Sequence, residues 1–219
     1  MVVGFLLEEP VGFGVAVLSI IVGGRLGYVF FYNFGYFLHN PLEIFAVWQG
    51  GMSFHGGLIG SILGLLIFCR KYKIEYLQIA DLFAIISPMG IFFGRLANFI
   101  NLELYGRPTE GNFGFIFPND PLLLPRHPSQ LYEGIFEGLF ITIALLLLAR
   151  YTKIQDKRGA LSGLFLVLYA IARAIIENFR EPDAHLGEFD LILFSATMGQ
   201  LLSLPIMALG LFVIFRKRS

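Results

Sequence analysis

The chain has 219 residues, of which 56% are hydrophobic and only 15% are charged, and its mean hydropathy is +0.72. This composition excludes a soluble globule, because too little polar surface is present to cover one, and it predicts an integral membrane protein. Basic and acidic residues balance at 16 each, and no nucleic-acid partner is expected. The one cysteine, Cys69, excludes an internal disulfide and a multi-cysteine metal site.

A membrane span needs about 20 mostly apolar residues, and about six windows of the chain qualify. In chain order they lie near 13–32, 56–69, 77–94, 131–149, 160–179 and 191–215. Apolar runs such as 141–148 lack the alternation of a β-barrel strand. The windows predict one transmembrane domain over 1–219, an all-α, polytopic integral membrane helical bundle. Residues 102–128 contain several prolines, cannot be a span, and are expected to form a small outward-facing head.

Basic residues cluster after the second, fourth and sixth windows. They are Arg70, Lys71, Lys73, Arg150, Lys153, Lys157, Arg158, Arg216, Lys217 and Arg218. Basic loops stay in the cytoplasm, so these connections and the C-terminus are expected inside and the head outside. Pro41–Trp48 would form a short interfacial helix on the outer side. Residues 1–10 carry no basic residue, although six spans that end inside should start inside, so a preceding span is expected to be missing.

The six basic residues that remain are all arginines, whose planar guanidinium groups bind phosphate or carboxylate with two hydrogen bonds. Three charged residues share one helix face in the fifth window, with Arg173, Glu177 and Arg180 at i, i+4 and i+7. The helix should end before Pro182. A self-contained salt-bridge ladder is one interpretation. One glutamate cannot neutralise two arginines, however, so the excess positive charge favours an anionic ligand.

Residues 94–109 place two arginines, two asparagines and a carboxylate at the end of an apolar window. Arg95 and Asn98 lie at i and i+3, and Glu103 follows about a turn later. A structural clasp, in which Glu103 or Asp81 pairs with Arg95, is the simpler alternative to a functional role.

Four arginines lie in or at the ends of the windows: Arg25, Arg95, Arg173 and Arg180. Unpaired, they would together cost on the order of 10 kcal/mol. The acidic residues expected nearby are Glu103, Glu177 and Glu133, which are fewer than needed. A lipid phosphate would supply the remaining negative charge.

His55 stands before two glycines where an outer loop enters the second window. A lone histidine is usually a satisfied interface residue, but the glycines permit close approach of a substrate, so catalysis by His55 is the alternative. His127 is expected to tie the head to a helix that Ser129 could cap. No histidine pair has metal-ligand spacing and no nucleotide loop or Gly-x-Ser-x-Gly motif is present, so no metal or cofactor is expected.

Five segments resemble the prolipoprotein diacylglyceryl transferase family, and the likeness extends over roughly residues 20–215. They are Gly24–Asn33, Phe54–Gly57, Gly94–Thr109, His127–Glu133 and Arg173–Asp183. The resemblance implies an enzyme of the bacterial inner membrane that moves the diacylglyceryl group of phosphatidylglycerol onto the lipobox cysteine thiol of a preprolipoprotein. A thioether would form and glycerol 1-phosphate would be released. The family has seven spans, and its first span, which bears a tyrosine implicated in the site, has no counterpart here.

The resemblance makes Arg95 and Arg173 the central basic residues around the phospholipid head and His55 the proposed proton acceptor. It places six further residues in the substrate pocket: Asn98, Asn101, Glu103, Gly106, Glu177 and Arg180. The chemistry of these side chains agrees, because preorganised arginines neutralise the charge that grows on a leaving phosphate. A positive field that lowers a thiol pKa from about 8.5 to about 7 supplies roughly 2 kcal/mol toward the reactive thiolate.

Two rival interpretations belong to other classes of protein. A carrier or channel for an anionic solute would use buried arginines to bind its cargo without altering it. A non-catalytic scaffold would retain phosphatidylglycerol and never consume it.

Overall fold

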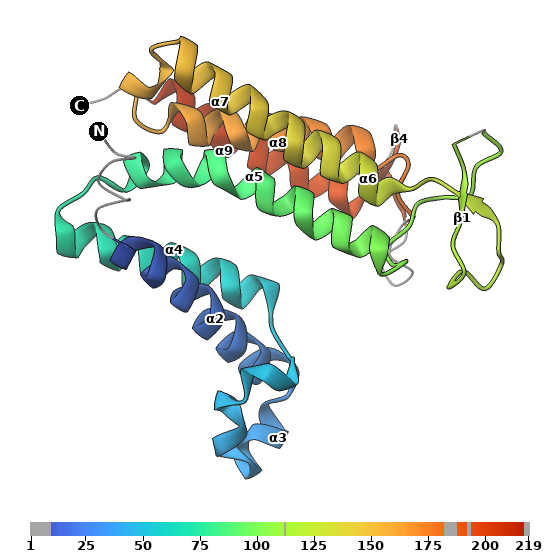
Figure 1. Cartoon of the computed structure of the whole chain (residues 1–219), viewed down its shortest axis with the longest axis horizontal. Coiled ribbons are helices and arrows are strands. Elements are labelled where there is room, and N and C mark those ends of the chain that lie inside the picture. Colours follow the sequence, from blue (N-terminus) through green and yellow to red (C-terminus); the bar gives the residue numbers. More distant parts are fainter. Residues whose placement is uncertain (1–9, 112, 182–187, 192–193, 217–219) are drawn as a thin grey trace. The chain divides into compact units, whose positions relative to one another are not determined.

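The computed structural model describes residues 10–111, 113–181, 188–191 and 194–216, and it is mostly helical (Figure 1). The side chains of these residues are described too, except at positions 10–13, 16, 49, 54, 55, 188–191, 194–199 and 202. The chain divides into two compact units, Met1–Ile79 and Ala80–Ser219.

The first unit is built on two helices that pack closely, α2 (Pro10–Tyr32) and α4 (Phe54–Tyr72). Glycines make this contact possible. A Cβ atom added at Gly27 would lie 2.7 Å from the Cα atom of Gly56, and one added at Gly23 would lie 2.8 Å from the Cα atom of Gly60. Gly56 and Gly60 of α4 therefore allow the two helices to pack closely.

The connection between α2 and α4 contains the short helix α3 (Phe34–His39) and two 3-10 turns, η1 (Pro41–Phe45) and η2 (Val47–Gln49). The prediction of one helix over Pro41–Trp48 is therefore wrong. Ala46 takes up ψ +63° between the two turns, which breaks the helical hydrogen-bond series.

Arg25 of α2 holds this connection in place. Its guanidinium group is buried and donates to four backbone carbonyl oxygens, with Nε 2.9 Å from Ile44, Nη2 2.6 Å from Glu43, and Nη1 bonded to Gly50 and Gly51. From the sequence, Arg25 was expected to need an acid or a lipid phosphate as its partner. Carbonyl oxygens fill that role instead, because several of them converge on one planar group.

The second unit begins in α5 (Tyr76–Ile100) and continues through a non-helical head with a two-stranded pair, β1 (Phe115–Ile116) and β2 (Pro125–Arg126). A continuous helix follows, made of α6 (Ser129–Glu133), the π-helical segment η3 (Gly134–Phe140) and α7 (Ile141–Tyr151).

The chain then passes through η4 (Ile154–Asp156) into α8 (Ala160–Ile176), the hairpin of β3 (Glu188–Leu191) and β4 (Phe194–Thr197), and α9 (Met198–Phe215). The fold is mostly helical, as expected, with two short β pairs that the all-α prediction did not include. The sixth window was predicted from residue 191. Its helix starts at Met198, because residues 188–191 and 194–197 use their backbone hydrogen bonds to pair as β3 and β4.

Buried polar contacts join the helices of the second unit. Asp81 of α5 accepts hydrogen bonds from the backbone N–H groups of Gly159 (2.7 Å) and Ser162 (2.8 Å) and from the Ser162 hydroxyl (2.8 Å). A carboxylate at the start of α8 satisfies donors that the helix itself cannot. Asp81 therefore fixes the helix that carries Arg173 at its other end.

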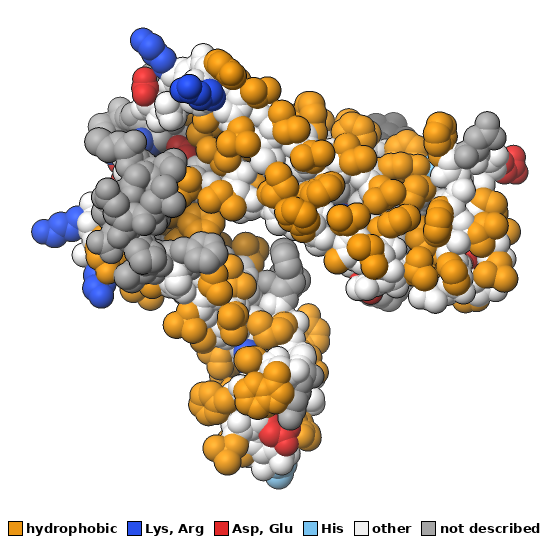
Figure 2. Space-filling model, viewed as in Figure 1, with side chains coloured by type: hydrophobic (Ala, Val, Ile, Leu, Met, Phe, Trp, Pro, Cys, Tyr) orange, Lys and Arg blue, Asp and Glu red, His pale blue; other side chains and the backbone are white. Residues whose placement is uncertain are grey.

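Two helices of the described residues are long and apolar enough to cross a membrane, Tyr76–Ile100 and Ser129–Tyr151. Shorter apolar helices cover Val17–Tyr32, Ala160–Ile176 and Ser203–Phe215. Hydrophobic side chains cover much of the visible surface along these helices (Figure 2). Such exposed apolar surface is the expected exterior of a protein that lies in lipid.

Candidate active site

Charged side chains from three helices meet inside the second unit. Arg95 of α5 places Nη2 2.8 Å from Oε2 of Glu133 in α6. Nη1 of Arg173 in α8 lies 3.0 Å from the same oxygen. Two guanidinium groups therefore converge on one carboxylate, and the Glu133 side chain is wholly buried.

Glu177 and Arg180 extend this network beyond the end of α8. Oε2 of Glu177 lies 3.0 Å from Nη2 of Arg173 and 3.9 Å from Nη1 of Arg180. Nε of Arg180 is 3.8 Å from Oε1 of Glu133. The structure thus brings together Arg95, Arg173, Glu177 and Arg180, which the sequence analysis assigned to one site.

The acidic partners are partly those that sequence reasoning overlooked. Arg95 was expected to pair with Glu103 or Asp81 if its role were structural. Its partner in the structure is Glu133, so that prediction is wrong. Glu137, which lies 3.6 Å from Arg173, was not considered at all. A signal was available, because two glutamates at i and i+4 in an apolar window are functional candidates by default.

Small residues explain how α5 comes close enough for this contact. A Cβ atom added at Gly138 would lie 2.7 Å from the backbone nitrogen of Phe92, and one added at Gly134 would lie 3.4 Å from Cβ of Arg95. The two glycines therefore let α5 approach the helix that carries Glu133.

Asn98, Asn101 and Glu103 form a second cluster next to the network. Oε1 of Glu103 accepts hydrogen bonds from Asn98 (2.9 Å) and Asn101 (3.4 Å). Leu102 and Leu104 on either side of Glu103 both have φ +57°. A left-handed conformation is unfavourable for leucine and persists where surrounding contacts impose it, as at functional sites.

Glu103 is also tied to the main network through the backbone. Its carbonyl oxygen accepts a hydrogen bond of 2.6 Å from the side chain of Gln130, in the same short helix as Glu133. This hydrogen bond links the asparagine cluster to the helix that carries Glu133.

Gly106 is buried where the head meets the end of α8. Its N–H donates to the carbonyl oxygen of His127 (2.9 Å), and it forms a β-bridge with Arg180. A Cβ atom at this position would collide with the backbone of Phe179. Gly106 thus permits the close approach that holds Arg180 next to the network. Nδ1 of His127 lies 3.4 Å from the hydroxyl of Tyr132 in α6, so His127 ties the head to that helix, as predicted.

The head has its own internal ion pair. Nε of Arg126 lies 2.6 Å from Oδ2 of Asp120, and both side chains are buried. The hydrogen bond from Arg126, together with backbone N–H donors, lowers the pKa of the Asp120 carboxyl group. Ser129 was expected to cap the helix after the head, and that prediction is wrong. Its hydroxyl donates to the carbonyl oxygen of Leu104 at 3.3 Å, and the cap position is Pro128.

His55 belongs to the first unit, in the first turn of α4. Its side chain lies outside the described residues, so its predicted part in catalysis stays a prediction.

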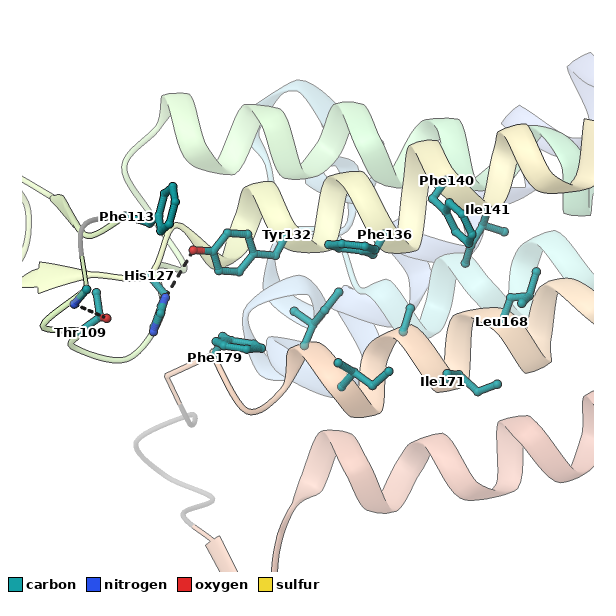
Figure 3. A pocket seen from close by; sticks show the side chains of 14 residues that line it. Thr109, Phe113, His127, Tyr132, Phe136, Phe140, Ile141, Leu168, Ile171 and Phe179 are labelled. Atoms are coloured by element: carbon teal, nitrogen blue, oxygen red, sulfur yellow. Dashed lines mark hydrogen bonds between the residues drawn. The ribbon is translucent and has the colours of Figure 1, made fainter.

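An apolar groove of about 600 Å³ runs between the α6–α7 helix and α8 (Figure 3). Phe136 and Phe140 face Leu168 and Ile171 across it, while Thr109, His127, Tyr132 and Phe179 lie at the end next to the head. The groove is lined almost entirely by hydrocarbon, as a site for acyl chains should be.

The groove and the charge network occupy neighbouring faces of the same two helices. Tyr132 and Phe136 line the groove, and Glu133 is adjacent in sequence to Tyr132. On α8, Ala172 lines the groove next to Arg173 of the network. The network is not sealed, because the Arg95 side chain remains 22% exposed. A ligand with a charged head and hydrocarbon chains matches this pairing of surfaces.

Exposed apolar helices with buried charge between them define a helical membrane protein. The chain matches the family model described as prolipoprotein diacylglyceryl transferase over residues 9–216. It therefore belongs to the prolipoprotein diacylglyceryl transferase family.

Similar proteins carry the name phosphatidylglycerol–prolipoprotein diacylglyceryl transferase. The protein of Azospirillum brasilense is 48% identical over 204 residues, which are 93% of this chain and 75% of that protein. The protein of Rickettsia felis is 52% identical over 199 residues, with 91% and 75% covered, and that of Rickettsia bellii is 50% identical over 212 residues, with 96% and 78% covered.

Proposed function

We propose that this chain transfers the diacylglyceryl group of phosphatidylglycerol to the lipobox cysteine thiol of preprolipoproteins. The bond between the glycerol carbon and the phosphate oxygen breaks, a carbon–sulfur bond forms, and glycerol 1-phosphate leaves. The observation that carries this proposal is the convergence of Arg95 and Arg173 on one oxygen of Glu133, at 2.8 Å and 3.0 Å. The family and the names of its members support the same reaction.

The geometry supports separate binding of the two parts of the lipid, the acyl chains and the phosphate. The acyl chains would lie in the apolar groove and the phosphate would bind the guanidinium groups of Arg95 and Arg173. Guanidinium groups held by surrounding carboxylates are preorganised, so they stabilise the leaving phosphate with little reorganisation. His55 is proposed to accept the thiol proton, because a histidine can take up a proton near neutral pH.

Asn98, Asn101, Glu103, Gly106, Glu177 and Arg180 are proposed to shape the pocket around the head group. We propose further that the chain spans the bacterial inner membrane several times, with the head outside and the basic loops and C-terminus in the cytoplasm.

The test is incubation of the purified protein with phosphatidylglycerol and a lipobox peptide, followed by mass spectrometry. We expect the peptide to gain the mass of one diacylglyceryl group. Arg95→Ala and Arg173→Ala should each lower the rate about 100- to 1000-fold, since each removes a donor to the leaving phosphate, while Arg150→Ala, an exposed residue at the end of α7, should not.

The same assay separates the rival functions. A lipid scaffold would bind phosphatidylglycerol without forming product, and a carrier would move solute across proteoliposomes without any covalent change. Near-normal turnover in the Arg95 or Arg173 variant would contradict the phosphate-binding role. A smaller loss in His55→Gln, with a changed pH profile, is expected if His55 accepts the proton.

A further inference from the structure

Glu137 is a buried carboxylate in the middle of the charge network. Its side chain is 0% exposed and it lies in the π-helical segment η3, one turn after Glu133. The ionic contact of its Oε1 atom is to Nη1 of Arg173, at 3.6 Å. Neither carboxylate oxygen accepts a hydrogen bond from any described residue. π-helical segments are rare and occur frequently at functional sites.

Glu133 and Glu137 compete for the same guanidinium nitrogen. Nη1 of Arg173 lies 3.0 Å from Glu133 but 3.6 Å from Glu137. Glu133 also receives Arg95 at 2.8 Å. Glu137 is therefore held more weakly than Glu133. A buried carboxylate that accepts no hydrogen bond is costly as an anion, and protonation relieves that cost.

The arrival of a phosphate changes the charge around Glu137. The groups that face it are Arg95 from α5, Glu133 from its own helix, and Arg173 and Tyr169 from α8. The two guanidinium groups and the two carboxylates, Glu137 included, carry equal and opposite charge. A phosphodiester adds one negative charge at Arg95 and Arg173, and closely spaced like charges in a buried site disfavour full ionisation.

We propose that Glu137 is a positioning residue that, by taking up a proton, removes one negative charge from beside Arg173 when the phosphate binds. As a carboxylate it lies 3.6 Å from Nη1 of Arg173 in the free protein, whereas Glu133 lies 3.0 Å from the same nitrogen. When the phosphate of the lipid binds, Glu137 takes one proton from solvent and becomes a neutral acid, and it returns that proton after the product leaves. This inference rests on the proposed function of the same site.

The test is calorimetric titration of the detergent-solubilised protein with phosphatidylglycerol in two buffers of different ionisation enthalpy. We expect the wild-type protein to take up about one proton per lipid bound. Glu137→Gln should bind the lipid and take up none, because glutamine resembles the neutral acid. Diacylglycerol, which lacks the phosphate, should cause no proton uptake with either protein.

A kinetic measurement gives a second readout. Proton uptake on binding means that binding weakens as the pH rises, so KM for phosphatidylglycerol in the wild type should increase by up to tenfold per pH unit. In Glu137→Gln the KM should be nearly independent of pH, with kcat changed much less than in Arg173→Ala.

Each outcome bears on one proposal. If wild-type protein forms the thioether but takes up no proton, or if Glu137→Gln takes up as many protons as the wild type, the role of Glu137 is refuted and the transfer function stands. If wild-type protein forms no thioether product, the transfer function itself fails. The proton uptake of the wild-type protein tests the role of Glu137 even if the variant does not fold.

Discussion

Arg25 shows at the scale of one residue that a buried guanidinium group can be satisfied without an acid. Its donors meet the carbonyl oxygens of Glu43, Ile44, Gly50 and Gly51, and its charge also lies over the ring of Phe37, with a distance of 5.1 Å to the centroid. The rigid fork of arginine fits this arrangement, whereas the ammonium group of lysine offers a single point charge. Arg25 therefore organises the connection between α2 and α4.

Arg25→Lys should destabilise the first unit by about 2–3 kcal/mol, because buried carbonyl oxygens would lose their donors. Trp48 is the single tryptophan and lies in η2, within the connection that Arg25 holds. Its fluorescence during thermal unfolding reports on this segment, and the transition should shift to lower temperature.

Arg70→Lys is the matched control for that measurement. Arg70 is exposed in the last turn of α4, so its replacement should change stability by no more than about 0.5 kcal/mol. Equal unfolding midpoints for the two variants would show that the carbonyl contacts of Arg25 contribute little.

At the scale of elements, the position of α5 against η3 decides the geometry of the site. Gly138 of η3 faces Phe92 of α5 with no room for a side chain, whereas Gly90 has no neighbouring atom within 4 Å of an added Cβ. Glycine is therefore required for the helix contact at position 138, whereas position 90 has room for a side chain. Since α5 carries Arg95 and the continuous helix carries Glu133, their separation sets the distance between these two side chains.

Gly138→Ala should cost about 1–3 kcal/mol of stability through overpacking and should lower the transfer rate by displacing Arg95. Gly90→Ala should leave the rate unchanged and be neutral or stabilising by up to about 1 kcal/mol, because alanine favours a helix. Thermal unfolding and the mass-spectrometric assay check both variants. Equal unfolding temperatures and equal transfer rates in the two variants would contradict the tight contact between Gly138 and Phe92.

At the scale of the whole molecule, the sequence places lysine only in the predicted cytoplasmic loops and at the C-terminus. The described helices between those loops expose mainly hydrocarbon. This distribution matches the basic-loop rule for membrane proteins, and it supports the proposed orientation, in which the head lies outside the cytoplasm.

Cysteine labelling tests that orientation. With Cys69→Ser as background, Glu110→Cys in the head should react with a membrane-impermeant maleimide in intact spheroplasts. Lys157→Cys, in the connection before α8, should react only after the membrane is permeabilised. Labelling of Lys157→Cys in intact spheroplasts would contradict the proposed orientation.

The sequence alone predicted the long helices and the arginines of the charge network. Apolar windows and i, i+4 spacing are local properties, so they located the long helices and placed Arg173, Glu177 and Arg180 on one face. The motif between Gly94 and Thr109 likewise pointed to Arg95. The start of the last helix was missed because the pairing of residues 188–191 with residues 194–197 was not visible in the hydrophobic pattern.

Only the tertiary structure decided which carboxylate meets which arginine, and it added Glu137 to the acidic residues expected from the sequence. Glu133 meets Arg173 across 40 positions of sequence, and it meets Arg95 because glycines bring two helices together. Such contacts depend on the distance and rotation between helices, which hydrophobic periodicity does not determine. For the same reason the sequence could name the arginines that need a counter-charge, but the packing of α5, α6 and α8 decided which carboxylates supply it.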